Sequence, residues 1–241
     1  MDDIEFSALE ETISFYTRND FAIINSLLAG NMDDLWKSAL TAYKDNKDII
    51  EEYKNGQRKI ESDYDVKWLK ILNKRCITDL DKSTKDKIIE TARKDIYNIL
   101  TAMHPIKSKI LLYRTAWIDE NNKFDNTYPY SHQYKSIYFL INDIISIKTI
   151  SSASLTPYRE DEIDCNFYRY EITVPAGRNV LELDQFVCHN ENDEVLLPPM
   201  KCKVIGIHNS DKEKCKGIVE LKYMEQLEIE NKEILQSPPI V

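Results

Sequence analysis

The stretch Asn190-Glu191-Asn192-Asp193-Glu194-Val195-Leu196-Leu197-Pro198-Pro199 changes abruptly from polar and acidic to apolar, and two prolines end it. Proline lacks the backbone N–H that a strand ladder needs, so the apolar segment is short. The pattern predicts a loop that leads into a short buried strand, with Glu194 as the first strand residue. A carboxylate at such a junction is easily solvated and well placed to act. The alternative interpretation is a solvated acidic turn before an ordinary strand.

The length and charge of the chain limit the classes of function that it can have. The chain has 241 residues, which suits one domain or one domain with an appendage. Hydrophobic residues make up 42% and charged residues 30%, as in an ordinary soluble globular protein. The net charge of −9 argues against general nucleic-acid binding, because neutralising phosphates needs clustered lysine and arginine. We therefore expect no nucleic-acid partner, whereas a local anion pocket is compatible with this charge.

Cysteines and histidines are isolated along the chain. They are Cys76, Cys165, Cys188, Cys202, Cys215, His104, His132, His189 and His208. Isolated thiols indicate a reducing compartment without a disulfide framework, and scattered histidines argue against a zinc site. The N-terminus Met1-Asp2-Asp3-Ile4-Glu5 is acidic and has no apolar run. We therefore expect no signal peptide, no transmembrane span and no membrane partner, although a removed leader is an open alternative.

The first hundred residues show the apolar spacing of amphipathic helices. We expect a helix at 6–16, a second at 21–28 that Asn19-Asp20 caps and Gly30 ends, and a third with one apolar face. The residues assigned to that face are Trp36, Leu40 and Tyr43. Segment 44–63 is very polar, which indicates an exposed helix or a loop. Further helices are expected around 66–72 and 88–100, with a turn and cap at 81–84.

After Pro105 the chain becomes rich in strand-forming residues. We expect strands at 109–117, 151–155, 167–174, 179–183, 194–197, 203–207 and 217–223. Segment 119–130 is a polar loop, and the apolar segment 136–150 is either helix or strand. Helices followed by many short strands predict an α+β fold with segregated layers. The expected domain covers 1–225, helical to 104 and strand-rich from 105, before a charged, mobile tail at 226–241.

Several candidate functional groups follow one another in a fixed order. They are Tyr16 and Asn25 in the helical part, Arg114 on the first long strand, Ser152-Ala153-Ser154, and Glu194. An arginine on an apolar strand must find an anion or a structural carboxylate, because an unpaired buried charge is costly. Packing or capping is the alternative role for Tyr16 and Asn25, and an edge strand is the alternative for the serines.

In this order the motifs resemble the mono-ADP-ribosyltransferases of the Arg–Ser–Glu class, which include clostridial-type toxins and vertebrate ecto-enzymes. The matching segments are ISFYTRNDFAIINSLL, LLYRTAW, ISSASL and ITVPAG…NENDEVLLPP, and they span about residues 8 to 207. The Rossmann and P-loop fingerprints of other nucleotide-binding proteins are absent from the sequence. The resemblance implies a mixed, mainly antiparallel core of two facing sheets, with a cleft for NAD.

The resemblance also implies roles for individual residues. Arg114 would bind a phosphate of NAD, Ser152 would support the nicotinamide ribose and the glutamate, and Glu194 would be catalytic. The remaining residues expected near NAD are Tyr16, Asn25, Ser154, and Tyr158 or Arg159 in the loop that covers the nicotinamide. These residue types suit the chemistry, because a fixed carboxylate stabilises an oxocarbenium-like cation. Planar arginine also suits a pyrophosphate better than lysine does.

Two residues depart from the family pattern. Ala153 replaces the threonine of the Ser-Thr-Ser motif, and Asn192 stands where the family has glutamate or glutamine. In the family that residue positions or activates the acceptor. Asparagine can hydrogen-bond an acceptor but cannot serve as a base, so Asn192 is a candidate catalytic residue of altered ability. Glu191 could substitute for it only after the loop rearranged, and the acceptor residue stays open.

The resemblance therefore implies an NAD-dependent protein mono-ADP-ribosyltransferase. Its expected partners are NAD, as co-substrate, and an acceptor protein of unknown identity, with no metal. Two alternatives stay open: a non-catalytic binding module on the same fold, and an NAD glycohydrolase. Free thiols and NAD both occur in a cytoplasm, so we expect the protein to act there. A toxin or effector delivered into the cytoplasm of a host cell is one possibility within this expectation.

Overall fold

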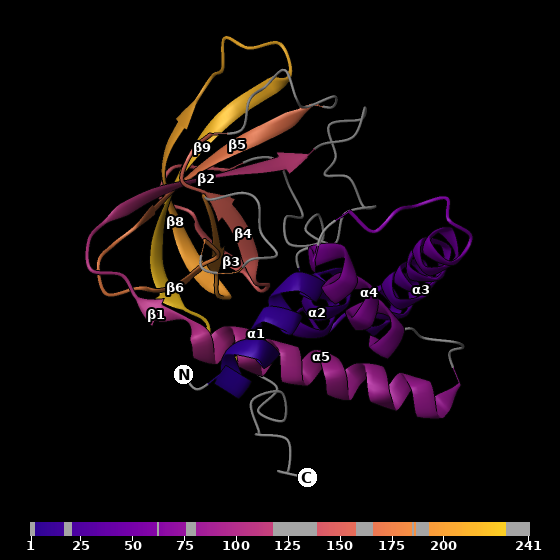
Figure 1. The fold of residues 1–241 in the computed structure, drawn as a ribbon. Coiled ribbons are helices and arrows are strands. Elements are labelled where there is room, and N and C mark those ends of the chain that lie inside the picture. The colour runs from indigo at the N-terminus through magenta and orange to yellow at the C-terminus, as the bar shows by residue number, and fades with distance from the viewer. Residues whose placement is uncertain are drawn as a thin grey trace. The chain divides into compact units, whose positions relative to one another are not determined.

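The computed structural model describes residues 3–16, 21–61, 63–75, 81–117, 139–157, 166–184, 186 and 193–229. They fall into two compact units (Figure 1). Unit 1 contains residues 1–101, 186–190 and 231–241, and unit 2 contains residues 102–185 and 191–230. Within the described ranges, no helix is long and apolar enough to cross a membrane. A single domain over 1–225 stays a prediction.

Unit 1 contains the helices, which include those that the apolar spacing predicts. Their bounds are α1 Asp3–Phe15, α2 Phe21–Leu28, α3 Met32–Lys54, α4 Asp63–Arg75 and α5 Lys82–Ala102. Gly30 follows α2 with a φ of 73°, a left-handed conformation that glycine adopts without steric cost. Asp81 caps α5, because its Oδ1 accepts a hydrogen bond of 2.7 Å from the backbone N–H of Thr84. That bond holds the pKa of the Asp81 carboxyl below its usual value.

The face predicted for α3 is wrong at Leu40, which is 45% exposed, whereas Trp36 is half-buried and the Tyr43 side chain lies outside the described ones. The described side chains of the helix that are buried are Leu35, Ala39, Ala42, Asn46 and Ile50. These residues repeat every three to four positions and form one stripe. The prediction assigned the core to large side chains, but small alanines occupy two of the buried positions. The polar segment 44–63 begins as the continuation of this helix, which ends at Lys54.

A buried polar cluster joins α1 to α5 within unit 1. The Thr12 hydroxyl donates to Asp95 Oδ1 at 2.9 Å and accepts from Asn98 Nδ2 at 3.1 Å. Thr12 and Asp95 are each 1% exposed, so water cannot replace these bonds. Buried polar groups are costly when they lose a partner, and the cluster therefore fixes how the two helices meet.

The described residues of unit 2 form a nine-stranded sheet with the order β1-β6-β7-β4-β2-β5-β9-β8-β3. The bounds are β1 His104–Pro105, β2 Ile110–Trp117, β3 Ile144–Ile147, β4 Ser151–Ser154, β5 Phe167–Val174, β6 Asn179–Glu182, β7 Glu194–Leu197, β8 Met200–His208 and β9 Cys215–Gln226. All pairs are antiparallel except β5 with β9. Part of the ambiguous segment 136–150 is therefore strand β3. The predicted α+β class is confirmed.

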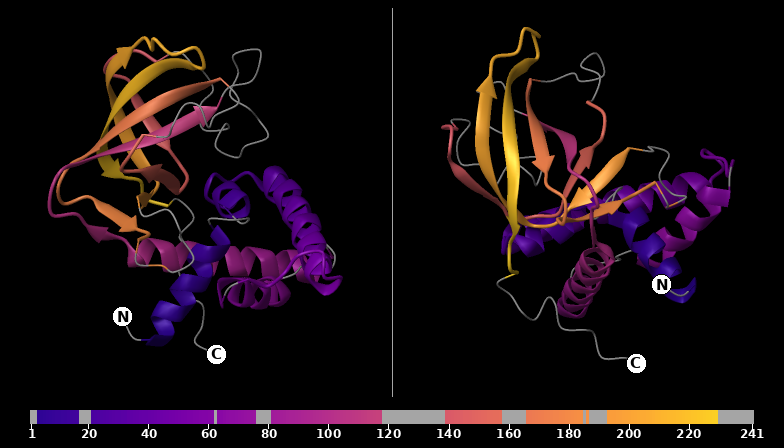
Figure 2. Two further views of the ribbon diagram at one scale, coloured as in Figure 1. Left: turned by 45° about the horizontal axis from the view of Figure 1, so that its top comes forward. Right: turned by 90° about the vertical axis from the view of Figure 1, so that its left-hand side faces the viewer.

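The sheet has a narrow seam between β2 and β4. Only Tyr113 and Ser154 pair across it, whereas β2 pairs with β5 along eight residues. Leu112 of β2 and Ala153 of β4 nevertheless pack in one core with residues from β5, β7, β8 and β9. The strands curl over one another and do not lie in one flat layer (Figure 2). The family resemblance implies two facing sheets, whereas the described strands form one continuous sheet.

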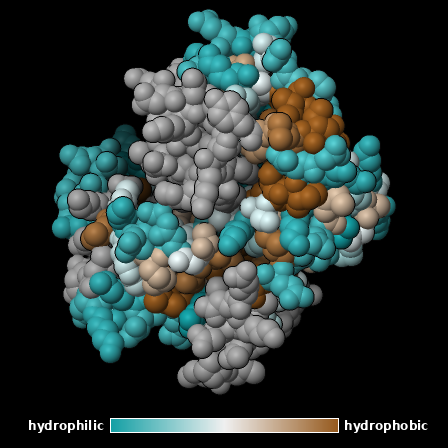
Figure 3. Space-filling view, turned by 180° about the vertical axis from the view of Figure 1, so that it is seen from behind, coloured by the Kyte–Doolittle hydropathy of each residue, from teal (hydrophilic) through white to brown (hydrophobic). Residues whose placement is uncertain are grey.

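Aliphatic side chains lie on the outer surface of unit 2. Ile205 of β8 and Met224 of β9 sit at bulges, without a partner on the neighbouring strand, and are 42% and 37% exposed. Leu140, Ile141 and Ile144 are exposed in and after the turn that precedes β3. Hydrophobic side chains gather in patches among hydrophilic ones on the strand-rich unit (Figure 3).

Two ionisable groups lie side by side in the core of unit 2. Cys202 and Tyr223 pair across β8 and β9 and are 0% and 1% exposed. Burial raises the pKa of the Cys202 thiol from 9.0 to about 12, and that of the Tyr223 hydroxyl from 10.0 to about 12. Within the described part of the chain, the Tyr223 hydroxyl has no hydrogen-bond partner. The folded state therefore keeps both groups protonated at pH values where the unfolded chain releases their protons.

Thr12→Val should destabilise the protein by about 1–3 kcal/mol, because it leaves Asp95 and Asn98 without their shared buried partner. The matched control is Thr41→Val, since the Thr41 hydroxyl bonds only within its own helix at an exposed position. Urea unfolding followed by circular dichroism measures both. Equal effects of the two variants would contradict a structural role for the cluster.

The contribution of these two groups to stability should be constant up to about pH 8 and fall as the pH rises toward 12, by at most about 1.4 kcal/mol per pH unit for each group. The sign follows from the raised folded-state pKa values of Cys202 and Tyr223. Tyr223→Phe should remove part of this slope and leave stability at pH 7 unchanged or slightly higher. Urea midpoints between pH 7 and 11 test this, and an unchanged slope in Tyr223→Phe would refute it.

Candidate active site

Glu194 is the first residue of β7, as the sequence predicts. It pairs with Ser154 of β4, and the next residue, Val195, pairs with Ala153. Val195 to Leu197 are buried and Glu194 is half-buried, so the strand begins where the chain enters the core. Pro198 and Pro199 separate β7 from β8, which starts at Met200. The strand thus presents one carboxylate at the margin of the core.

Ser152 holds the carboxylate of Glu194. Ala153 and Val195 face the core, and since strand side chains alternate, Ser152 and Glu194 lie on the opposite side of β4 and β7. There the Ser152 hydroxyl donates a hydrogen bond to Glu194 Oε1. A hydrogen bond to an ionised acceptor is stronger than one between neutral groups. The serine therefore fixes the orientation of the Glu194 carboxylate on the side of the strands that faces away from the core.

Arg114 lies next to the backbone of Ser152, at the seam of the sheet. It follows Tyr113, the one residue of β2 that pairs with β4, and it is opposite Tyr170 of β5. Its side chain is on the core-facing side of β2, like that of Leu112, and Arg114 is 9% exposed. Its Nη1 donates to the Ser152 carbonyl at 3.4 Å, a long and weak contact. The serine thus contacts both charged groups, one through its backbone and the other through its side chain.

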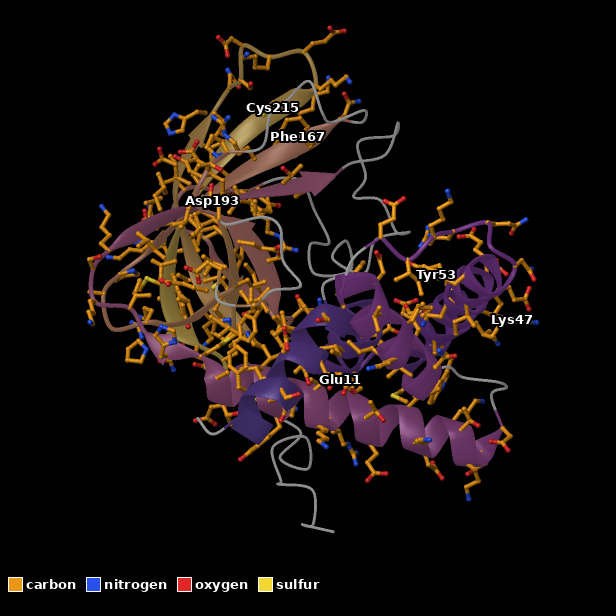
Figure 4. The ribbon with its side chains drawn as sticks, in the orientation of Figure 1. Glu11, Lys47, Tyr53, Phe167, Asp193 and Cys215 are labelled. Carbon is orange, nitrogen blue, oxygen red and sulfur yellow. The ribbon has the colours of Figure 1, made fainter. Side chains whose placement is uncertain are left out.

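The backbone around Glu194 is anchored to both neighbouring strands. The Leu183 N–H, just after β6, donates to the Glu194 carbonyl at 3.0 Å. On the other side, the Leu155 N–H donates to the Asp193 carbonyl at 2.9 Å. Asp193 lies within the strand-rich unit (Figure 4). Both peptide groups next to the candidate catalytic residue therefore have fixed positions.

Sequence reasoning missed Asp193 and Thr156. The Thr156 hydroxyl donates to Asp193 Oδ2 at 3.0 Å, and the Thr156 N–H donates to Ser154 Oγ at 3.2 Å. Ser154, predicted to lie near NAD, thus serves in a local turn at the end of β4. No spacing in the sequence indicates the bond between Thr156 and Asp193, because the two residues are 37 positions apart.

The other predicted site residues are not brought to this site by the described contacts. Tyr16 and Asn25 belong to unit 1 and are each 1% exposed, which fits the alternative role in packing. Their approach to NAD stays a prediction. Asn192, Tyr158 and Arg159 lie outside the described residues, and so does Glu191.

No protein-family model matches the chain, and no curated protein does. Among solved structures, the ATR domain of Salmonella SpvB matches with a TM-score of 0.53 at 15% identity, over 90% of this chain and 99% of that one. An ADP-ribosyltransferase from Clostridium botulinum gives a TM-score of 0.44 at 16% identity, over 90% of this chain and 86% of that one. An ADP-ribosyltransferase toxin from Paenibacillus larvae gives 0.40 at 17% identity, over 61% of this chain and 74% of that one.

The match to the SpvB domain extends over nearly the whole of both chains, and at this identity it concerns the fold. The arrangement of helices and mixed sheet is consistent with it. The predicted resemblance is therefore confirmed at the level of the fold: the chain has an α+β fold like that of the SpvB ATR domain.

Proposed function

We propose that the chain is an NAD-dependent mono-ADP-ribosyltransferase that modifies a protein side chain. The observation that carries the proposal is the hydrogen bond from Ser152 to Glu194, with Arg114 held against the same serine. The three residues come from strands that are neighbours in the sheet order, β7, β4 and β2. They are an arginine, a serine and a glutamate in the order of the family motif, on a fold that resembles these enzymes.

In the proposed reaction the bond between the nicotinamide nitrogen and ribose C1′ breaks. The bonding electrons stay with the nitrogen, so the cationic pyridinium leaves as neutral nicotinamide and no strong general acid is needed. Positive charge develops on C1′ and the ring oxygen, as in glycoside cleavage. The acceptor nucleophile then forms a bond to C1′ and loses its proton, which gives the ADP-ribosylated side chain.

The role of Glu194 is to stabilise that positive charge. A carboxylate held in place before the reaction needs no reorganisation when the charge develops. Ser152 supplies part of this preorganisation, because its hydroxyl bonds Glu194 Oε1. A carboxylate has about four acceptor positions, so it can accept a bond from the ribose 2′-hydroxyl as well as one from serine.

The role of Arg114 is to bind the pyrophosphate of NAD. A guanidinium has five N–H donors in a planar fork that matches phosphate geometry, and one of them, on Nη1, contacts the Ser152 carbonyl. At 9% exposure the charge is shielded from bulk water, which strengthens its interaction with a phosphate. A lysine at this position would keep the positive charge but would lose the planar set of N–H donors.

NAD hydrolysis is the second candidate activity, and Asn192 favours it. An amide at this position can orient an acceptor but cannot remove its proton. Transfer to a weakly acidic acceptor would then be slow, and water would compete for C1′. Nicotinamide release without protein labelling distinguishes hydrolysis from transfer.

Glu194→Gln should lower the rate of nicotinamide release from NAD roughly 10²- to 10³-fold, because the neutral amide no longer stabilises the cation. The readout is nicotinamide released by the purified protein, with and without a cell lysate and labelled NAD. Glu213→Gln, in the exposed segment before β9, is the matched control and should match wild type. A wild-type protein that releases no nicotinamide under either condition would refute the proposed function.

Arg114→Lys should raise the KM for NAD roughly tenfold or more, since a paired charge-assisted hydrogen bond is lost while the charge is kept. The kcat at saturating NAD should change much less, because the guanidinium binds away from the breaking bond. Far-ultraviolet circular dichroism checks that the partly buried lysine leaves the fold intact. A folded variant with an unchanged KM would remove Arg114 from the NAD site.

A further inference from the structure

We propose that Thr156 is a positioning residue for the reaction, which fixes Glu194 by holding Asp193 against the end of β4. The inference rests on the proposed function, because it concerns the same carboxylate. It adds a residue that lies outside the Arg–Ser–Glu motif and is joined to the site through Asp193. The clamp is the set formed by Ser154, Leu155, Thr156 and Asp193.

The clamp contains one backbone bond and three side-chain bonds, the longest of which joins the Ser154 and Thr156 hydroxyls at 3.5 Å. The Leu155 N–H donates to the Asp193 carbonyl at 2.9 Å, and the Thr156 hydroxyl donates to Asp193 Oδ2 at 3.0 Å. The Thr156 N–H donates to Ser154 Oγ at 3.2 Å, which turns the chain back at the end of β4. Asp193 is therefore bonded through both its backbone and its side chain to residues that follow the serine motif.

Glu194 needs this clamp because it begins a strand. Its pairing with Ser154 is the last of the β4–β7 ladder, and the backbone beyond a ladder end frays easily. The Leu155 bond extends the ladder by one residue, and the Thr156 hydroxyl fixes the Asp193 side chain to it. A displacement of about 1 Å can cost roughly 100-fold in rate, so small motions of Asp193 matter for Glu194.

Ser152 and Thr156 hold different parts of the chain at Glu194. Ser152 holds the Glu194 side chain and Thr156 holds the backbone that precedes it. Thr156 is exposed and contributes little to the core, so its removal should change the position of the carboxylate more than the stability of the fold. That difference separates a positioning role from a merely structural one.

The test uses two substitutions of Thr156 in the full chain. Thr156→Val removes the hydroxyl at nearly constant volume and should lower kcat for nicotinamide release roughly 3- to 10-fold, the worth of one lost hydrogen bond. The KM for NAD should stay within about twofold, because the pyrophosphate contact is unchanged. Thr156→Ser keeps the hydroxyl and should restore kcat to nearly the wild-type value.

Asp193 and a matched threonine complete the experiment. Asp193→Ala should lower kcat as Thr156→Val does, and the double variant should lose no more than either single one, because both remove the same bond. Thr173→Val, on β5 and half-buried, is the control and should behave like wild type. Urea midpoints of all the variants should agree closely with wild type.

The outcomes separate this inference from the proposed function. A wild-type protein without NAD cleavage refutes the proposed function, and the positioning role with it. An active wild-type protein whose kcat is unchanged by Thr156→Val overturns the positioning role alone. So does an equal loss in Thr156→Ser or Thr173→Val, because the hydroxyl would then not be the cause. Amide exchange at Leu155, faster in Thr156→Val, would connect a lower kcat to the clamp.

Discussion

The seam between β2 and β4 is the constraint on which the site depends. The described strands form one sheet around a shared core, and a single residue pair, Tyr113 with Ser154, joins β2 to β4 within it. Arg114 follows that pair on one side, and Ser152 lies two residues before it on the other. The same geometry that closes the core therefore brings a buried guanidinium next to the strand that carries the serine.

The site combines one shielded cation with one held anion. Arg114 is almost buried and keeps a weak contact with a backbone carbonyl, while the half-buried Glu194 is oriented by a hydroxyl. We propose that Arg114 binds an anionic group and that Glu194 stabilises a developing cation. NAD offers both, a pyrophosphate and a glycosidic carbon that becomes cationic. The strands provide the rigidity that such preorganisation requires.

Much of the fold was predictable, because apolar spacing reports which side chains are buried. The helices, the strand that begins at Glu194 and its end at the prolines follow from local patterns. The buried face of α3 was not predictable, since small alanines contribute little to the apolar pattern of a helix. Strand β1 was not predictable either, because it is only two residues long. Thr156 and Asp193 were missed for another reason: their bond depends on how β4 and β7 pair, and register is a tertiary property that no local pattern encodes.

The most direct measurement of the central claim is a crystal structure of Glu194→Gln with NAD bound, since this variant should bind NAD and cleave it slowly. We expect the pyrophosphate to lie against the Arg114 guanidinium, and the nicotinamide ribose to lie within hydrogen-bond distance of Ser152 and the residue at position 194. NAD bound elsewhere on the molecule, or a saturated crystal with no NAD near β2, β4 and β7, would contradict the proposed site.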